Sequence, residues 1–216
     1  MKKPLLSALC FLLGALLGAV LCLLSVTLKM SHENKNTVPA VPAVPISADG
    51  EEAEETVSAA YSVLSAIRDG DYETLAAFVH PEYGLIISPY STVNLASNQC
   101  FTPVRVASIA KDDTEYIWGT RPDTGEPIQM TAAAYFSGFA YDCDFMAAPL
   151  LGVNRIVKSG NALENVATVF PDGDFVDFCV PGSDEEGLEW KILRLVFEPY
   201  EDTLRLTAVI HSQYTN

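Results

Sequence analysis

The sequence is poor in basic residues, and this shortage excludes two classes of partner. Its 216 residues include 13 Lys and Arg against 28 Asp and Glu, for a formal net charge of -15. Phosphate backbones and anionic lipid surfaces repel a chain of this charge. We therefore expect neither nucleic acid nor an anionic membrane surface as the main partner.

The sequence also lacks the common motifs of catalysis and of metal or cofactor binding. It has no Gly-rich phosphate loop, no Gly-x-Ser-x-Gly elbow and no His-Glu-x-x-His helix. Beyond residue 50 it has three cysteines, Cys100, Cys143 and Cys179, and none belongs to a Cys-x-x-Cys pair. The acidic turn at residues 172–177 lacks the closing glutamate of a calcium loop. We predict no metal site, no cofactor and no catalytic set, and leave open whether two of the cysteines form a disulfide.

Charge is missing altogether from one long stretch near the start. Residues 4–28 are 25 uncharged residues flanked by lysines. As a helix they would span roughly 37 Å, more than the ~30 Å hydrocarbon core of a bilayer. We predict a transmembrane anchor within residues 1–30. The alternative is a cleaved secretory signal, but the apolar part of such a signal is usually about 7–15 residues long.

A Pro-rich linker, residues 31–50, follows the predicted anchor. Its Val-Pro-Ala near-repeat places proline at every third position and favours an extended polyproline II spacer. Of the 28 acidic residues, 26 lie beyond Gly50, where only nine Lys and Arg occur. Positive charge favours the cytoplasmic side of a membrane. We therefore expect a cell-membrane protein whose domain, residues 51–216, is extracytoplasmic, or a secreted one if the signal is cleaved.

Helices are predicted at the start of this domain. Apolar residues recur at helical spacing up to the breaker Asp69-Gly70, and Asp71 is placed to cap a second, shorter helix that ends at Pro81. After Gly84, the run Leu85-Ile86-Ile87 reads as a strand.

Strands dominate the rest of the domain. The turn sequence Pro122-Asp123-Thr124-Gly125 predicts a hairpin over residues 115–131, and Thr131 is placed to cap a helix through Tyr141. Further predicted elements are a strand at 154–158, a helix at 162–169, and strands at 174–180, 188–200 and 203–214. In the last strand, apolar side chains alternate with a mixed set that includes His211, which indicates one buried and one mixed face. The expected fold class is α+β, with helices packed on a curved, mostly antiparallel sheet.

The order of these elements resembles the nuclear transport factor two-like superfamily, also called the cystatin-like α+β cone. The stretches FVHPEYGLIISPY, YIWGTRPDTGEPIQMT and LEWKILRLVFEPYEDTLRLTAVIHSQYT look like a group of anchored or secreted bacterial proteins of unassigned function. The resemblance implies a curved sheet wrapped over helices, with a cone whose open end often holds a small apolar ligand. Because this superfamily includes both enzymes and binding domains, the resemblance does not decide the activity.

Candidate ligand-binding residues are the aromatic and titratable side chains of the predicted cone. They are Tyr61, His80, Tyr83, Trp118, Trp190 and His211. Asp142 joins them as a candidate for proton transfer. For each histidine the alternative is a structural hydrogen bond, and for each tryptophan it is a place in the core.

Three functions are compatible with these patterns. The first is a non-catalytic, membrane-tethered domain that binds a small apolar ligand or an envelope protein. The second is a structural module that forms a homodimer through the open face of its sheet. The third is an isomerase-like or hydrolytic enzyme that acts on an apolar substrate.

Overall fold

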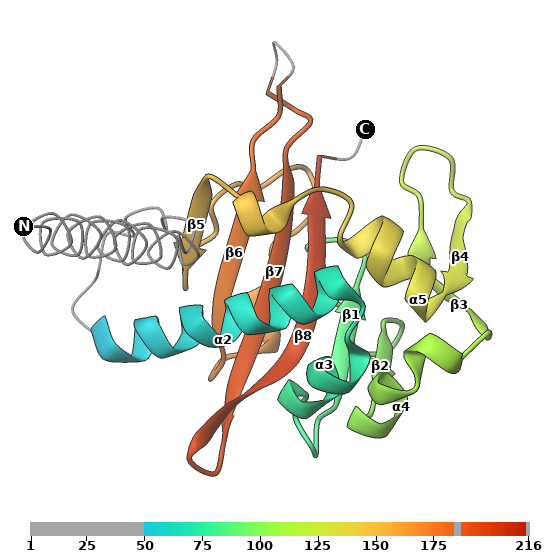
Figure 1. Ribbon diagram of the computed structural model, residues 1–216. Coiled ribbons are helices and arrows are strands. Elements are labelled where there is room, and N and C mark those ends of the chain that lie inside the picture. The colour runs from blue at the N-terminus through green and yellow to red at the C-terminus, as the bar shows by residue number, and fades with distance from the viewer. Residues whose placement is uncertain (1–49, 184–186, 215–216) are drawn as a thin grey trace, which may run out of the picture. The chain divides into compact units, whose positions relative to one another are not determined.

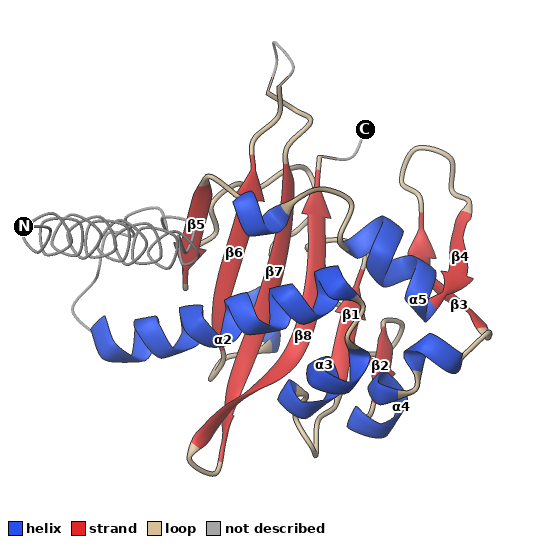
Figure 2. Cartoon of the chain, viewed as in Figure 1, coloured by secondary structure: helices blue, strands red, loops and turns tan. Residues whose placement is uncertain are grey.

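The computed structural model describes residues 50–183 and 187–214 of the chain (Figures 1 and 2). The predicted anchor at residues 4–28 and the Pro-rich repeat after it lie outside the described residues. Within those described, no helix is both long enough and apolar enough to cross a membrane.

The domain is α+β, as predicted, and is built on a curved, mixed sheet of six strands in the order β2-β1-β8-β7-β6-β5. The strands are β1 (Leu85–Ser88), β2 (Gln99–Phe101), β5 (Leu150–Val153), β6 (Asp174–Val180), β7 (Lys191–Tyr200) and β8 (Thr203–Gln213). Every pairing is antiparallel except that of β1 with β8. The prediction of a mostly antiparallel sheet is thus confirmed in outline, and its cone shape stays a prediction.

Two leading helices pack on one face of this sheet. The long helix α2 (Gly50–Asp69) crosses β6, β7 and β8 in Figure 1, and its buried stripe is Ala60, Val63, Leu64 and Ile67. The short helix α3 (Tyr72–Phe78) begins at Asp71, whose Oδ1 accepts a hydrogen bond of 3.0 Å from the Thr74 N–H. This is the N-cap that the sequence predicts, because Asp satisfies N–H groups that have no partner inside the helix.

A hairpin and a helical turn extend the same side of the sheet. Strands β3 (Glu115–Thr120) and β4 (Pro127–Thr131) form a separate two-stranded sheet, and Gly125 in its turn has a φ of 72°. The Thr131 hydroxyl accepts a hydrogen bond from the Ala134 N–H and caps α5 (Ala132–Tyr135). Beyond α5 the helix does not continue as an α-helix to Tyr141, but widens into the π-helical turn η2 (Phe136–Ala140).

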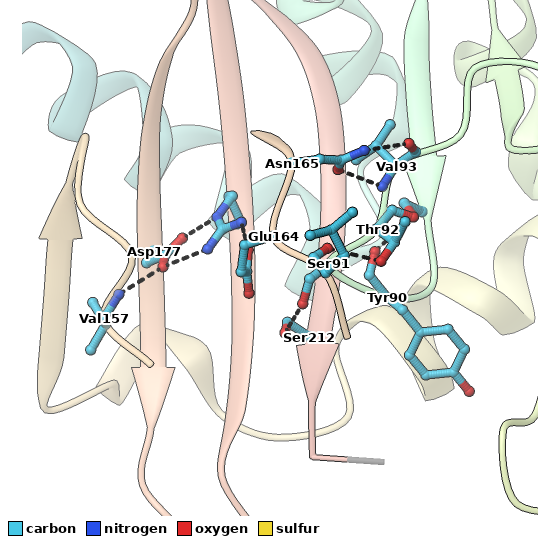
Figure 3. Close-up of polar contacts among 12 residues, drawn as sticks. Tyr90, Ser91, Thr92, Val93, Val157, Glu164, Asn165, Asp177 and Ser212 are labelled. Carbon is cyan, nitrogen blue, oxygen red and sulfur yellow. Dashed lines mark hydrogen bonds and ion pairs between the residues drawn. The ribbon is translucent and has the colours of Figure 1, made fainter. Parts of the chain in front are cut away.

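The opposite face of the sheet is covered by the chain itself. Residues 154–170, called here the cover segment, run across this face, where Glu164 contacts Arg194 of β7 and Asn165 reaches Val93 (Figure 3). The cover segment ends in the short helix α6 (Val166–Val169), and the apolar cluster on this face includes Val166, Phe170, Val196 and Ala208. This face is therefore covered by residues of the same chain.

Three parts of the sequence prediction are wrong or incomplete. The strand expected at residues 154–158 lies instead at Leu150–Val153, because Asn154 adopts a φ of 51° and ends it. The helix expected at 162–169 is reduced to α6. The sequence pattern does not indicate the short elements β2, α4 (Pro103–Ala107), η1 (Ile109–Lys111) and η3 (Phe145–Ala147). Elements of three to five residues span too few periods to show a hydrophobic pattern.

Candidate functional site

A row of stacked rings fills the space between the β3–β4 hairpin and the sheet. Trp118 of β3 stacks on Tyr135 of α5 with ring centroids 4.2 Å apart and planes inclined by 23°. Tyr135 stacks on Phe139 of η2 at 5.2 Å, and Phe139 lies 5.2 Å from the imidazole of His211 on β8. Trp118, Tyr135 and His211 are all buried. The row therefore leads from an apolar interior to a buried titratable group.

Asp142, which forms an ion pair with Lys191, contacts one nitrogen of that imidazole. His211 is 1 % exposed, and its Nε2 lies 3.3 Å from Oδ1 of Asp142. The other carboxylate oxygen of Asp142 forms an ion pair of 2.7 Å with Nζ of Lys191, the first residue of β7. Burial is the largest influence and acts to raise the pKa of Asp142, but His211 and Lys191 together outweigh it and hold that pKa below its usual value. The carboxylate is thus ionised and accepts from both neighbours.

This arrangement determines which nitrogen of His211 carries its hydrogen in the neutral ring. An ionised carboxylate only accepts hydrogen bonds, so Nε2 must donate to Asp142. In that neutral ring Nδ1 keeps its lone pair and is an acceptor, whereas in a protonated ring both nitrogens donate. In the described part of the chain, Nδ1 is buried and has no hydrogen-bond partner.

A second buried polar atom on the same row also lacks a partner. The hydroxyl of Tyr135 makes no hydrogen bond to any of the described residues, although the side chain is fully buried. Burial raises the pKa of Tyr135 well above its usual value, so the group stays protonated and remains a donor. The two residues that carry these unpaired atoms, Tyr135 and His211, both have rings in contact with Phe139.

Phe139 belongs to a backbone irregularity. The Tyr141 N–H donates to the Phe136 carbonyl at 3.0 Å, a bond to the fifth residue back in place of the fourth. π-helical turns are rare and occur frequently at functional sites. The turn is therefore a second reason to treat this region as a candidate site.

His80 has a structural role. It follows α3, and its Nδ1 accepts hydrogen bonds from the backbone N–H groups of Glu82 and Tyr83 at 3.2 and 3.0 Å. Its ring stacks on that of Tyr83 at 4.2 Å and meets Tyr200 edge-on. Because the His80 N–H donates to the carbonyl of Leu206, five residues before His211, the two histidines are separated along β8 by about 17 Å.

The structure does not bring the other candidates together. Tyr61 is half-buried on α2 and meets Phe178 edge-on at 5.1 Å. Tyr83 is 62 % exposed. Trp118 donates from Nε1 to the Met130 carbonyl inside the hairpin core, and Trp190 packs with Cys179 and Ile192 in an apolar cluster of its own. Two pairs of the named candidates are neighbours, His211 with Asp142 and His80 with Tyr83.

The expected mixed face of the last strand is corrected by the structure. Leu206 and His211 contribute to the same side of β8 as Val209, because β8 has a bulge at Thr207, opposite the step from Val196 to Phe197 of β7, which shifts the register by one residue. A one-residue shift moves a side chain to the other face. Residues 206–212 are buried on both faces, since the helices cover one face and the cover segment covers the other.

Sequence reasoning missed the other members of the site. Phe139, Tyr135 and Lys191 were not singled out, and Asp142 was named without its partner. The helical pattern after Thr131 marks Tyr135 and Phe139 as neighbours on one helix face, four residues apart. No local signal joins Asp142 to His211, because 69 residues separate them.

Neither metal nor thiol chemistry is supported at this site. Among residues 50–183 and 187–214, no group of His, Cys, Asp and Glu is arranged to hold a metal ion. Burial raises the pKa of Cys143, next to Asp142, to about 12, so this thiol is a poor nucleophile. The three described cysteines, Cys100, Cys143 and Cys179, are free.

A separate surface hollow lies along α2. It measures about 470 Å³ and is lined by Glu54, Glu55, Ser58, Ala59, Ser62 and Phe78. None of the predicted site residues lines it.

Comparison with known proteins identifies no family. No protein-family profile matches the chain, and no curated protein matches it significantly. Among solved structures, one similar chain is assigned as a calcium/calmodulin dependent protein kinase II association domain from Xanthomonas campestris. Its TM-score is 0.35 at 11% identity, over 79% of this chain and 91% of that one. Another is a DUF4783 family protein from Bacteroides ovatus, with a TM-score of 0.28 at 9% identity, over 72% and 94%. Both scores are low, so neither structure identifies the function of this chain.

Proposed function

We propose that the chain is a membrane-tethered, extracytoplasmic protein whose α+β domain binds a small ligand at His211, without catalysis. The tether is supported by the 25 uncharged residues at 4–28, which are long enough to span a bilayer. The extracytoplasmic location is supported by the small number of Lys and Arg, nine, in residues 51–216.

The observation that supports binding is the unpaired Nδ1 of the buried His211. Leaving a buried acceptor without a donor costs about 1–3 kcal/mol, and folded proteins pair nearly all such groups. Asp142 fixes this ring through Nε2, so Nδ1 keeps one orientation. A bound molecule that donates a hydrogen bond to Nδ1 would remove this cost.

Catalysis is the second candidate, and the same residue pair favours it. A carboxylate that orients an imidazole is the arrangement of a general base. Binding ranks first because the thiol beside the pair has a strongly raised pKa and no metal-binding group lies among the described residues. Pairing of two copies through the sheet ranks third, because the cover segment occupies its outer face.

Native mass spectrometry of the full chain, purified from membranes, tests ligand binding. We expect a co-purified small molecule on the wild type that is lost from His211→Gln. The matched control is His80→Asn, since Asn retains an acceptor for the two N–H groups that His80 serves and lies outside the site. A ligand retained by His211→Gln but lost from His80→Asn would overturn the assignment of the site.

Fractionation of cells tests the tether separately. We expect the chain to remain in the membrane pellet after carbonate extraction and to keep its first residues in intact-mass measurement. Release of a shortened chain into the soluble fraction would replace the tethered protein by a secreted one.

A further inference from the structure

Two asparagine side chains clamp the cover segment to the rest of the domain. The side chain of Asn154 accepts a hydrogen bond from the Phe175 N–H at 2.7 Å and donates one to Asp174 at 2.6 Å. The side chain of Asn165 bonds to both backbone groups of Val93, each at 2.9 Å (Figure 3). Neither clamp uses an atom of residues 155–164, which are called here the strap.

The strap itself is only lightly packed. It contains no helix or strand, and none of its residues is fully buried. Its side chains Ile156 and Leu163 are 38 % and 69 % exposed. Val157 is half-buried and packs against the buried cluster that contains Cys179. Segments with irregular backbone and few buried apolar contacts open at a lower free-energy cost than the strands beneath them.

Polar contacts hold the strap against the domain. The Val157 N–H donates to Asp177 at 3.1 Å, and the Leu163 carbonyl accepts from the Thr92 hydroxyl at 2.8 Å. Glu164, the last residue of the strap, accepts from Nη1 of Arg194 at 2.7 Å. Glu164 thus joins the strap to the central strand β7 through an ion pair.

We infer that the strap opens as one unit while the sheet stays folded, and that the ion pair between Glu164 and Arg194 holds it shut. The strap is then a device that controls access to the outer face of the sheet. This inference is independent of the proposed ligand site, which lies on the other side of the sheet.

Opening leaves no unpaired charge in the sheet. When Glu164 moves away, Nε and Nη2 of Arg194 keep their bonds to the carboxylate of Asp177. Breaking a buried ion pair is costly mainly because it leaves one charge without its partner. Glu164 gains from opening, because its Oε1 is buried without a hydrogen-bond partner among the described residues and would meet water. Opening therefore costs less than the loss of an ordinary buried ion pair.

One buried thiol lies beneath the strap. Cys179 is fully buried in a small cluster on the outer face, and Val157 of the strap packs against that cluster. Cys143 packs instead against the core cluster to which α2 contributes. Opening of the strap therefore exposes Cys179 and leaves the surroundings of Cys143 unchanged.

Labelling of the full chain in lipid nanodiscs with iodoacetamide tests the strap, with each thiol followed by peptide mass spectrometry. Glu164→Ala leaves Nη1 of Arg194 without its acceptor as long as the strap is closed, which disfavours the closed state. We expect Cys179 to be labelled about tenfold faster or more in this variant, and Cys143 at the wild-type rate. An unchanged rate at Cys179, or an equal acceleration at Cys143, would overturn the inference.

A matched variant within the strap tests the role of the ion pair. Leu163→Ala removes an exposed side chain next to Glu164 and keeps the contact with Arg194. We expect it to leave the labelling of Cys179 unchanged. An acceleration as large as that in Glu164→Ala would show that the ion pair does not hold the strap shut.

The urea dependence of labelling in the wild type separates opening of the strap from unfolding of the domain, without a variant. Unfolding of the domain exposes far more surface than opening of the strap, so its free energy falls more steeply with urea. We expect the labelling rate of Cys179 to stay nearly constant at low urea and to rise only close to the unfolding midpoint. A steep rise from zero urea would overturn the inference, because Cys179 would then be reached only through unfolding of the domain.

Discussion

Arg194 and Asp177 form a doubly hydrogen-bonded ion pair in which neither side chain is exposed. Nε of Arg194 lies 2.5 Å from Oδ1 of Asp177, and Nη2 lies 3.0 Å from Oδ2. Nη1 of Arg194 reaches Glu164 of the cover segment at 2.7 Å (Figure 3). The pair thus connects two central strands of the sheet to the segment that covers them.

Replacing Arg194 by Met should destabilise the fold by about 3–5 kcal/mol, because Asp177 is left as a buried charge without its partner. Arg194→Met/Asp177→Leu should recover a large part of this loss. Denaturant unfolding followed by the fluorescence of the two tryptophans measures both variants. Asp69→Asn, which removes an exposed ion pair with Arg68, is the control and should leave the midpoint unchanged. If the double variant were no more stable than Arg194→Met, the uncompensated charge would not be the cause.

Asp142→Asn should reveal a pH-dependent contribution to stability. The pKa of Asp142 is lowered in the native state, so the unfolded chain takes up the proton first as the pH falls. The stabilising effect of the carboxylate is therefore complete above its ordinary pKa of about 3.9 and is lost as the pH falls through the lower native value. Unfolding free energies measured from pH 3 to pH 7 should show wild type above the variant near neutrality, with the gap closing in acid. A gap that is constant over this range would contradict the assignment.

Gly138→Ala should stabilise the chain by about 0.5–1 kcal/mol. Gly138 lies in η2, its φ is not among the positive values, and an added methyl group would meet no atom within 4 Å. Alanine loses less conformational freedom on forming a helix than glycine does. Gly125→Ala is the contrasting variant and should destabilise the fold, because a residue with a side chain disfavours the φ of 72° found at Gly125. Thermal unfolding measures both, and a shift of the same sign in the two variants would rule out this explanation.

The described cysteines should differ in their reactivity. Burial raises the pKa of all three thiols, to about 12 for Cys143 and to about 11 for Cys179, but Cys100 is exposed at the surface. Because the thiolate is the reactive form, iodoacetamide at pH 8 should label Cys100 about tenfold or more faster than the other two. Peptide mass spectrometry of the native chain follows each site. Equal labelling rates in the native chain would contradict the burial of Cys143 and Cys179.

The sequence predicted those elements whose signals lie within a few residues. Helix α2, the cap at Asp71, the turn at Gly125 and the cap at Thr131 each depend on neighbouring residues, and the structure confirms them. The sequence does not predict the parallel pairing of β1 with β8. The two strands are far apart in the chain, and the pattern of each is compatible with a parallel or an antiparallel partner. The π-helical turn also has no local signature, since Phe136–Ala140 reads as ordinary helix.

The candidate site was predicted only as separate residues. The chemistry of His211 and Asp142 marks them as candidates, but the bulge of β8 at Thr207 decides which face of that strand carries His211. The contact between Asp142 and His211 then forms because η2 ends beside that face. The contacts of Phe139 with Tyr135 and His211 could not be predicted from the sequence, since one phenylalanine on a helix is normally part of the core.

The sequence by itself determined the acidic charge, the long uncharged stretch at residues 4–28, the Pro-rich spacing and the α+β class, because these follow from composition and short-range periodicity. Only the tertiary structure decided that the outer face of the sheet is covered and that His80 serves a turn while His211 keeps an unpaired nitrogen. The reason is physical: burial and hydrogen-bond partners depend on residues brought together from distant parts of the chain, and register shifts as small as one residue decide which side chains meet.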